Sequence, residues 1–330
     1  MIPWKPFLRA CAFVESIVAF LVILFGASEV KKPEIGIYAD KLNQSHFFAN
    51  TVEDSLPQTV VYGIVLDHFK SPLPAGKTAK KAIVIGYDGA RADALFNSAG
   101  VAESGVQALL AGGGAAYNMY TGGKFPFYQD TSTAPGWTTM LTGVWAKATG
   151  GHGVSANGMN KNLRPLTLFT ELVEQNLLRN TAFVVSWGGH FTSADSSYIN
   201  EVTYANGKGY GARMVWDKQP SDAGSAASIL ALVQDTSLAG PDFSFVILEH
   251  CDSAGHGTGF SNNNPKYVQA FKDSDKMAYD IIQAIKARPD YASEDWLILI
   301  GSDHGGYDTG HGQQFATARQ VFLVSNKAVR

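Results

Sequence analysis

Five short runs of apolar residues, each followed by a polar or glycine-rich turn, constrain the fold of this chain more than any other feature. They are KAIVIGYD (81–88), TAFVVSW (181–187), FSFVILEHCD (243–252), WLILIGSD (296–303) and VFLVSN (321–326). Nearly continuous apolar strands are those that are buried on both faces, as in a parallel sheet covered by helices. The five runs therefore predict the strands of a buried sheet.

Segments with helical character lie between these predicted strands. They span residues 91–113, 165–178 and 265–288. In the last segment Pro265 suits the first position of a helix, and apolar residues recur at helical spacing. Strand, helix and strand in this rhythm predict an α/β fold, a three-layer α/β/α sandwich with a mainly parallel central sheet.

The composition limits the partners of the chain. Of its 330 residues 45% are hydrophobic and 17% charged, and the formal net charge is -3. This is enough apolar material for a large core, and it gives no electrostatic support to extended nucleic acid binding. A substrate that carries phosphate must therefore be attracted by a local charge, such as a bound cation.

Residues 1–28 have the layout of an export signal. Lys5 and Arg9 precede an apolar stretch at 17–26, and small residues follow. This order is typical of a secretory signal, and the alternatives are an uncleaved signal anchor and a buried core helix. The apolar stretch is shorter than the roughly twenty residues of a membrane span. We expect an exported protein that is secreted, or that contacts the membrane only through this segment.

The rest of the chain divides into two parts. Residues 29–80 are interpreted as a linker or peripheral segment, and residues 81–330 as the catalytic domain. The chain stops just after the last predicted strand, which leaves open a truncation of this domain at its C-terminus. Cys11 falls in the signal-like segment and Cys251 in a predicted strand, so we expect no disulfide and a buried thiol.

Three of the predicted strands end in an aspartate, namely Asp88, Asp252 and Asp303. Ligands of open α/β sheets bind beyond the carboxyl ends of the strands, so these three carboxylates are expected at one edge. A single aspartate at such a place is more often a helix cap or a turn residue. Three of them, each followed by Gly or His within four residues, favour a shared binding site.

Histidines accompany two of these aspartates. His256 stands four residues after Asp252, and His304 directly follows Asp303 within GSDHGGYDTGHG (301–312). Carboxylate oxygens together with imidazoles suit Zn²⁺, with Mn²⁺ as second choice. A lone histidine in such a loop would more often be a surface or hydrogen-bonding residue. Three histidines with three aspartates at strand ends instead favour a metal site.

A threonine motif supplies a candidate nucleophile. In DTSTAPGWTTMLTGVW (130–145), Pro135 favours a helix that starts there and leaves Thr133 at its N-terminus. Unpaired amides and the helix dipole hold an anion at such a place. The Thr133 hydroxyl needs a base or a metal to become a nucleophile, and the alternative role is a helix cap.

Taken together and in order, five motifs resemble those of the alkaline phosphatase superfamily, closest to its type I phosphodiesterase and nucleotide pyrophosphatase branch. The motifs are VIGYDGARADAL, STAPGWTTMLTG, HGVSANG, DSAGHG and SDHGG. The resemblance covers residues 81–325 and implies an alkaline phosphatase-like fold. It also implies hydrolysis of a small-molecule phosphoester of the nucleotide or lipid headgroup type.

The resemblance implies two divalent metal ions, both Zn²⁺ in most relatives, with Mn²⁺ as the alternative. One would be held by Asp88, Thr133, Asp303 and His304, and the other by Asp252, His256 and His311. Two such ions and three carboxylates leave a net charge of about +1, which favours phosphoester binding and the Thr133 alkoxide. Thr133 would form a covalent phosphothreonine, and water would then hydrolyse it.

Asn157 matches the asparagine of the family that donates a hydrogen bond to a phosphoryl oxygen. Its local alternative is a left-handed turn residue beside Gly158. His311 follows His304 after only seven residues, whereas many phosphodiesterase relatives place this ligand much later. If the chain is truncated, another ligand would come from the missing part. Asp308 is interpreted as a turn residue, because Asp252 already provides the carboxylate of that site.

The motifs also separate the function classes. Sulfatase relatives carry an arginine two residues after the motif proline, where this chain has Trp137, so a sulfatase is disfavoured. Monoesterases usually add an arginine or a third metal, and the only arginine of the motif loops, Arg91, is expected to face solvent. The sequence thus favours a phosphodiesterase. A phosphomonoesterase, a cell-surface phosphoglycerol or phosphoethanolamine transferase and a non-catalytic metal-binding protein remain alternatives.

Overall fold

The computed structural model describes residues 52–158, 167–191 and 198–329. The expected export signal at 1–28, Cys11 and the first part of the expected linker, 29–51, lie outside the described residues. Within the described ranges, no helix is both long enough and apolar enough to cross a membrane.

The described part of the chain is built on an eight-stranded sheet with the order β1-β3-β8-β7-β2-β6-β4-β5. Strand β8 is antiparallel to its neighbours β3 and β7, and the other pairs are parallel. The predicted α/β class with a mainly parallel sheet is therefore confirmed. The strands are β1 (Leu56–Pro57), β2 (Ala79–Tyr87), β3 (Ala115–Tyr120), β4 (Thr181–Val185), β5 (Met214–Lys218), β6 (Phe243–Leu248), β7 (Glu294–Gly301) and β8 (Gln320–Ser325).

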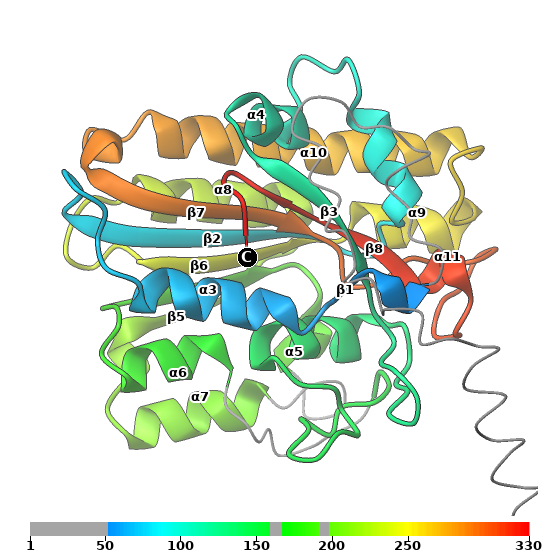
Figure 1. Cartoon of the computed structure of the whole chain (residues 1–330), viewed down its shortest axis with the longest axis horizontal. Coiled ribbons are helices and arrows are strands. Elements are labelled where there is room, and N and C mark those ends of the chain that lie inside the picture. Colours follow the sequence, from blue (N-terminus) through cyan, green and yellow to red (C-terminus); the bar gives the residue numbers. More distant parts are fainter. Residues whose placement is uncertain (1–51, 159–166, 192–197, 330) are drawn as a thin grey trace, which may run out of the picture. The chain divides into compact units, whose positions relative to one another are not determined.

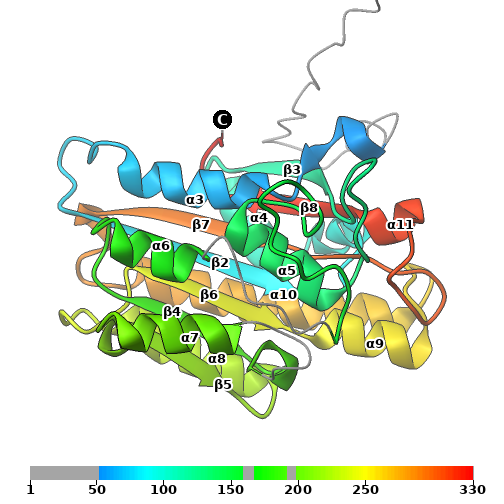
Figure 2. The same cartoon turned by 90° about the horizontal axis from the view of Figure 1, so that it is seen from below.

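Helices cover both faces of this sheet, as Figures 1 and 2 show. One face packs against α4 (Gly105–Ala111), α8 (Asp222–Gln234), α9 (His250–Thr258) and α10 (Pro265–Lys286). The other packs against α3 (Val60–Lys70), α5 (Thr133–Thr142), α6 (Leu168–Glu174) and α7 (Tyr198–Gly207). A short helix, α11 (Ala316–Arg319), precedes β8.

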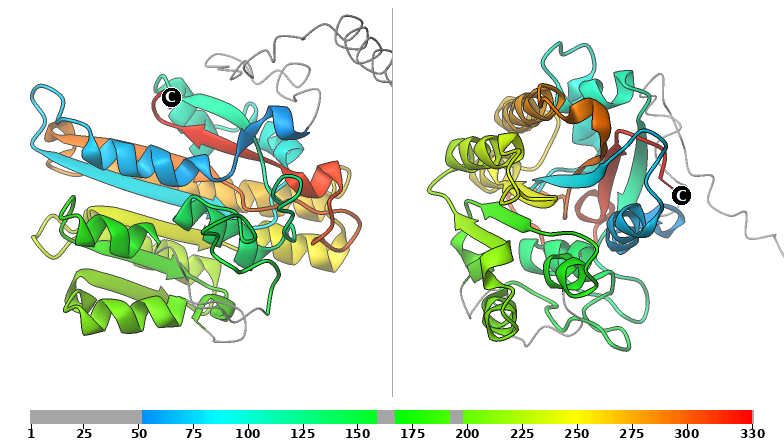
Figure 3. Two further views of the ribbon diagram at one scale, coloured as in Figure 1. Left: turned by 60° about the horizontal axis from the view of Figure 1, so that its bottom comes forward. Right: turned by 90° about the vertical axis from the view of Figure 1, so that its left-hand side faces the viewer.

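The central strands are buried because both of their faces are apolar. In β2, Ile83 and Ile85 belong to the core on one side of the sheet, while Ala82 and Val84 belong to the core on the other. Successive side chains of a strand point to opposite faces, so this alternation places a helix layer on each side. The right-hand view of Figure 3 looks nearly along the strands and shows the sheet between the two helix layers.

Four predicted strands agree with β2, β4, β7 and β8 to within two residues at each end. The fifth prediction, 243–252, is too long, because β6 ends at Leu248 and the polar and small residues after it coil into α9. Asp252 therefore lies in the first turn of a helix and not at a strand end. Its carboxylate still lies at the same edge of the sheet.

Two of the three predicted helical segments agree with the structure, and the third is divided. The segment 265–288 is α10 with Pro265 at the predicted first position, and α6 lies within 165–178. The segment 91–113 is instead a 3₁₀ helix, η2 (Ala92–Ser98), followed by α4. Gly100, with φ of 74°, ends the first of these.

Residues 52–78, interpreted as part of a linker or peripheral segment, contribute to the fold. They include a 3₁₀ helix, η1 (Val52–Asp54), then β1, which pairs with β3, and then α3. Val61 and Val65 of α3 are completely buried against the sheet. Strands β1, β3 and β5 and helices α7 and α8 were not predicted, because their short or weakly patterned segments carry little local signal.

Candidate active site

The candidate site lies where three neighbouring parallel strands end. Asp88 follows β2, Asp303 follows β7, and Asp252 lies one helical turn beyond β6. Strand β2 pairs with β6 on one side and with β7 on the other. The carboxyl ends of these strands meet at one edge of the sheet, so the three carboxylates come together as the sequence predicted.

Thr133 opens helix α5 directly beside Asp88. The helix begins at Thr133, two residues earlier than Pro135 suggested, and Ser132 takes the capping position in an extended conformation. Thr133 is therefore not the helix cap. Its Oγ1 lies 3.4 Å from Asp88 Oδ1 and 3.4 Å from His304 Nε2. The hydroxyl thus faces the carboxylate and imidazole groups from the positive end of a helix.

A first cluster consists of Asp88, Asp303 and His304, all fully buried. His304 Nε2 lies 3.4 Å from Asp88 Oδ1 and 3.5 Å from Asp303 Oδ2. The other ring nitrogen, Nδ1, is 2.8 Å from the Gly305 carbonyl oxygen. Donation from Nδ1 to that carbonyl leaves the lone pair on Nε2, which is the arrangement of a metal-binding histidine.

Asp303 is oriented by two donors from other parts of the chain. Gly89 N donates to Asp303 Oδ1 over 3.2 Å, and Gln58 Nε2 donates to the Asp303 carbonyl oxygen over 2.8 Å. Asp303 Oδ2 has no hydrogen-bond partner although it is buried. A buried carboxylate oxygen without a donor fits a cation ligand, because leaving it unpaired is costly.

A second cluster consists of Asp252, His256 and His311. His256 Nε2 lies 3.4 Å from Asp252 Oδ2, and His311 Nε2 lies 3.5 Å from Asp252 Oδ1. The two Nε2 atoms are 3.0 Å apart, and His256 Nδ1 lies 2.9 Å from the Thr309 carbonyl oxygen. Both imidazoles thus direct a nitrogen toward the same carboxylate.

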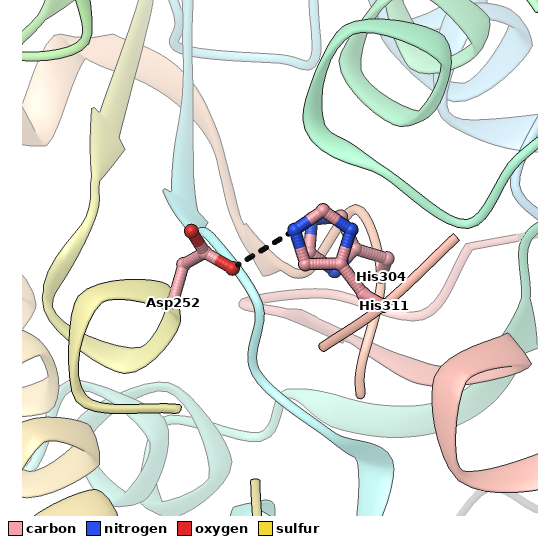
Figure 4. A group of neighbouring side chains, drawn as sticks. All are labelled: Asp252, His304 and His311. Atoms are coloured by element: carbon pink, nitrogen blue, oxygen red, sulfur yellow. Dashed lines mark ion pairs between the residues drawn. The ribbon is translucent and has the colours of Figure 1, made fainter. Parts of the chain in front are cut away.

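The two clusters adjoin one another. Figure 4 shows the Asp252 carboxylate turned toward the His311 ring, with the His304 ring beside it. The ring centroids of His304 and His311 are 4.1 Å apart. Ligand atoms of Asp252, His304 and His311 lie within 4.8 Å of one another, and so do those of Asp88, Asp303 and His304.

A positive charge would stabilise the ionised carboxylates of the site. Burial, reinforced by the neighbouring carboxylates, raises the pKa of Asp88 and of Asp303 well above the usual range. Burial raises the pKa of Asp252 to about 6, and burial together with the charge of His256 lowers the pKa of His311 to about 4. A divalent cation favours both the charged carboxylate and the neutral imidazole. These residues therefore fit a metal.

Sequence reasoning missed Glu249. It stands at the N-cap position of α9, three residues before Asp252, and its side chain makes no capping hydrogen bond. Ligand atoms of Asp88, Glu249 and Asp252 lie within 4.8 Å of one another. Burial and the charge of Asp88 raise the pKa of Glu249 well above its usual range. The available signal was its place directly after a predicted strand core, three residues before a candidate ligand.

Asn157 lies at the start of α5, next to Thr133. Its Oδ1 accepts a hydrogen bond from Ala134 N over 2.8 Å. The positive φ of this turn, 76°, belongs to Gly158, so the left-handed turn role considered for Asn157 is wrong. Because Oδ1 is engaged with the helix, the Nδ2 group is the donor that Asn157 can offer to a ligand.

The expectation that Arg91 faces solvent is wrong. Its side chain is only 16% exposed and forms an ion pair with Asp93. Nη1 also donates to the Phe260 carbonyl oxygen over 2.6 Å. The Phe260 ring in turn contacts the rings of His256 and His311. Asp308 has the left-handed φ of 53° expected of a turn residue.

A comparison with protein families identifies the family of this chain. A family model described as type I phosphodiesterase / nucleotide pyrophosphatase matches residues 82–319, a span that includes every candidate site residue. The chain belongs to this family. The predicted resemblance to this family is therefore confirmed. A comparison with curated protein sequences found no match.

Solved structures of remote similarity also match. Murine ectonucleotide pyrophosphatase/phosphodiesterase 5 is 16% identical with a TM-score of 0.44, covering 68% of this chain and 57% of that one. Alkaline phosphatase from the Antarctic bacterium TAB5 is 12% identical with a TM-score of 0.46, covering 76% and 91%. The lipoteichoic acid synthase LtaP from Listeria monocytogenes is 12% identical with a TM-score of 0.47, covering 82% and 72%. The chain thus spans 57% of the murine protein.

Proposed function

We propose that this chain hydrolyses phosphate diesters through a covalent intermediate on Thr133 at a site for two divalent metal ions. The observation that carries the proposal is the position of Thr133 Oγ1, 3.4 Å from both Asp88 Oδ1 and His304 Nε2 at the N-terminus of α5. A threonine hydroxyl is a weak nucleophile until a base or metal activates it. Here the groups that would hold such a metal lie next to the hydroxyl.

The ligand sets follow from the two clusters. Asp88, Thr133, Asp303 and His304 would hold one ion, and Asp252, His256 and His311 the other. Their mixture of carboxylate and imidazole suits Zn²⁺, with Mn²⁺ as the alternative. Bound there, divalent ions would lower the pKa of the Thr133 hydroxyl and of water and would neutralise charge on the phosphoryl oxygens.

The proposed reaction consists of two successive displacements at phosphorus. In the first, Thr133 Oγ1 releases its proton to solvent and attacks phosphorus, and the leaving oxygen departs with the electron pair of its bond to phosphorus and takes up a proton from solvent if it is basic enough. Asn157 Nδ2 donates to a phosphoryl oxygen, because its Oδ1 is held by Ala134 N. In the second, water attacks the phosphothreonine, the bond from phosphorus to Thr133 Oγ1 breaks, and the hydroxyl is restored.

The charges around the site favour a diester. A monoester dianion carries one more negative charge than a diester and needs additional cationic groups. Arg91, the arginine nearest in sequence to the metal cluster, is engaged by Asp93 and by the Phe260 carbonyl. The site is therefore better matched to the singly charged phosphodiester.

The wider setting is part of the same proposal. Residues 1–28 export the chain or anchor it, and the catalytic domain begins near residue 81, with residues 52–80 packed onto it. The substrate is a small phosphoester outside the cytoplasm, of the nucleotide or lipid headgroup type.

The test uses the purified full chain. Metal is removed with a chelator and restored as Zn²⁺ or Mn²⁺, and hydrolysis of bis-(p-nitrophenyl) phosphate, p-nitrophenyl phosphate and p-nitrophenyl sulfate is compared. We expect about two bound metals and the fastest turnover on the diester, with little on the sulfate. The Thr133→Ala variant should lose turnover while it retains metal.

The possible contrary results have different meanings. Full activity of Thr133→Ala would exclude the covalent mechanism. A protein that binds about two metals but hydrolyses none of the three substrates would point to a transferase or to a non-catalytic metal-binding protein. Faster turnover of the monoester would indicate a phosphomonoesterase. A protein that binds no metal would contradict the proposal at its centre.

A further inference from the structure

Five aromatic side chains stand exposed on two loops next to the candidate active site. Their exposed fractions are 79% for Phe125, 38% for Phe127, 37% for Tyr128, 58% for Tyr307 and 51% for Phe315. We call these five residues the aromatic rim. Single exposed apolar residues are ordinary, but a group of large ones beside a binding site marks an interaction surface.

The two loops are hydrogen-bonded to each other beside the catalytic groups. Thr131, two residues before Thr133, accepts at its carbonyl oxygen from Gly312 N over 2.9 Å, and its Oγ1 donates to the Gln313 carbonyl oxygen over 2.7 Å. Gln314 Nε2 donates to the Gln129 carbonyl oxygen over 2.7 Å. Because Gly312 directly follows His311, the aromatic rim borders the entrance to the site.

Arg319 holds the base of the first loop in place. This buried arginine donates from Nη2 to the Gly123 carbonyl oxygen over 2.7 Å and lies 5.5 Å from the centre of the Tyr128 ring. The tip that carries Phe125 is therefore supported from below while its side chain remains in solvent. Tyr307 and Phe315 of the second loop pack together, with ring centroids 5.2 Å apart.

The same arginine connects the aromatic rim to the start of the described chain. Arg319 Nη1 forms an ion pair with Glu53 of η1. The apolar stretch at 17–26 is separated from this point by residues 27–51, which reach at most roughly 80–90 Å when fully extended. A membrane that holds the N-terminal segment would thus lie within that distance of Glu53, which Arg319 links to the loop of Phe125.

We propose that the aromatic rim docks on the surface of a lipid bilayer. Aromatic rings are favoured at the boundary between headgroups and acyl chains, where an apolar body can be buried and a polar tip stays wet. Phe125 is too exposed to be one wall of a closed pocket for a small molecule. Lys124 interacts with Glu53, and Lys147 interacts with Asp130, so no excess of positive charge is available for anionic lipid and ring insertion drives the contact.

Docking of this kind adds a second membrane contact to the N-terminal one that the sequence predicted. It would present the site to phosphodiesters within the headgroup layer. The docking itself does not depend on the proposed hydrolysis, because the aromatic rim contains none of the residues assigned to metal binding or to catalysis.

The test places an environment-sensitive NBD fluorophore on the full chain. Phe125→Cys is compared with Leu238→Cys, both in a Cys11→Ser background, since Cys251 is completely buried. Leu238 is a matched control because its side chain is 78% exposed, against 79% for Phe125. It lies in the loop before β6, at the opposite edge of the sheet from the site.

With phosphatidylcholine vesicles we expect the emission at position 125 to rise and shift to the blue, and the emission at position 238 to stay constant. Equal responses at both positions, or none at either, would overturn the proposal. A response at position 125 to AMP alone, without vesicles, would instead assign the aromatic rim to an aromatic leaving group. These readouts need no turnover, so a failed hydrolysis assay leaves them intact.

A second variant, Phe125→Ser combined with Phe127→Ser, links docking to catalysis. We expect loss of activity on a phosphodiester lipid in vesicles, with unchanged activity on soluble bis-(p-nitrophenyl) phosphate. Equal loss on both substrates would contradict membrane docking, because it would mean that the aromatic rim acts on the soluble substrate too.

Discussion

Trp137 donates a hydrogen bond from its indole Nε1 to Asp88 Oδ2 over 2.7 Å. Trp137 stands one turn after Thr133 in α5, and Thr133 faces the other oxygen of the same carboxylate at 3.4 Å. Side chains of one helix thus face both oxygens of Asp88. The indole ring also packs so closely on β2 that a side chain at Gly86 would meet it at 2.4 Å. The contact positions Thr133 and the Asp88 carboxylate relative to each other.

Replacing Trp137 with Phe should weaken metal binding. The buried Asp88 carboxylate would lose the hydrogen bond from the indole. Removing a residue that is hydrogen-bonded to a metal ligand lowers metal affinity or activity roughly 10–100-fold. Titration of the metal-free protein with Zn²⁺ measures the effect. Trp296→Phe is the matched control, since Trp296 Nε1 donates to Glu294 Oε2 over 2.8 Å at the far end of β7. Equal losses in both variants would indicate a general loss of stability.

Asn157 should act as a donor to the substrate as well as an acceptor for the helix. Asn157→Asp preserves the acceptor for Ala134 N but removes the Nδ2 donor and adds a negative charge. We expect a roughly 10²-fold lower kcat with the melting temperature nearly unchanged, since a donor to a developing oxyanion contributes on this scale. Asn157→Ala should lower both quantities. A fully active Asn157→Asp variant would limit the residue to capping.

In the metal-free protein, the Asp252 carboxyl should contribute less to stability as the pH rises through about 6. Burial raises the pKa of Asp252 from 3.8 to about 6, so between these values the folded chain keeps a proton that the unfolded chain has lost. This carboxyl stabilises the folded chain by roughly 3 kcal/mol when the pH is below the pKa of the unfolded state, as expected for a shift of this size. That stabilisation is lost as the pH rises above the pKa of the folded state.

Asp252→Asn removes that dependence. Without metal, its melting temperature at neutral pH should exceed that of the unmodified chain, while the two should agree at about pH 4. Added Zn²⁺ should stabilise the unmodified chain strongly and the variant weakly. Thermal melts at both pH values, with and without Zn²⁺, check this. Equal stabilisation of the two proteins by Zn²⁺ would show that Asp252 is not a ligand.

Arg91→Lys should affect one metal and not the substrate. The arginine is tied to Asp93 and to the Phe260 carbonyl, and the Phe260 ring supports His256 and His311. Lysine cannot reproduce the paired geometry of a guanidinium. We expect the bound metal to fall from about two ions toward one, with KM for the diester unchanged. A raised KM at full metal content would instead show that Arg91 contacts substrate.

The sequence predicted the parts of this protein whose signal is local. The apolar runs that became β2, β4, β7 and β8 are buried on both faces, and α10 shows its helical spacing and its proline start. Three aspartates near the ends of neighbouring parallel strands were sufficient to predict a common edge. The ordered motifs were sufficient to predict the family, which the match over residues 82–319 confirms.

Local patterns failed where a segment depends on what it packs against. The residues after Leu248 read as more strand, yet they form α9, so Asp252 reaches the site from a helix. Arg91 read as a surface residue, yet contacts from residue 93 and residue 260 bury most of it. Glu249, next to β6, and Trp137, in α5, come close to Asp88 only because these two elements pack near it in the folded chain. Residue spacing along the sequence does not show this proximity.

By itself, then, the amino-acid sequence determined the α/β class, the buried strands and the carboxylates and imidazoles of the site, because burial periodicity and residue chemistry are properties of short segments. Only the tertiary structure decided which oxygen of Asp88 faces Thr133, what supports His256 and His311, and that two loops distant in sequence bring their aromatic residues to one entrance. Those outcomes depend on strand order and on packing between remote segments, which are set when the whole chain folds.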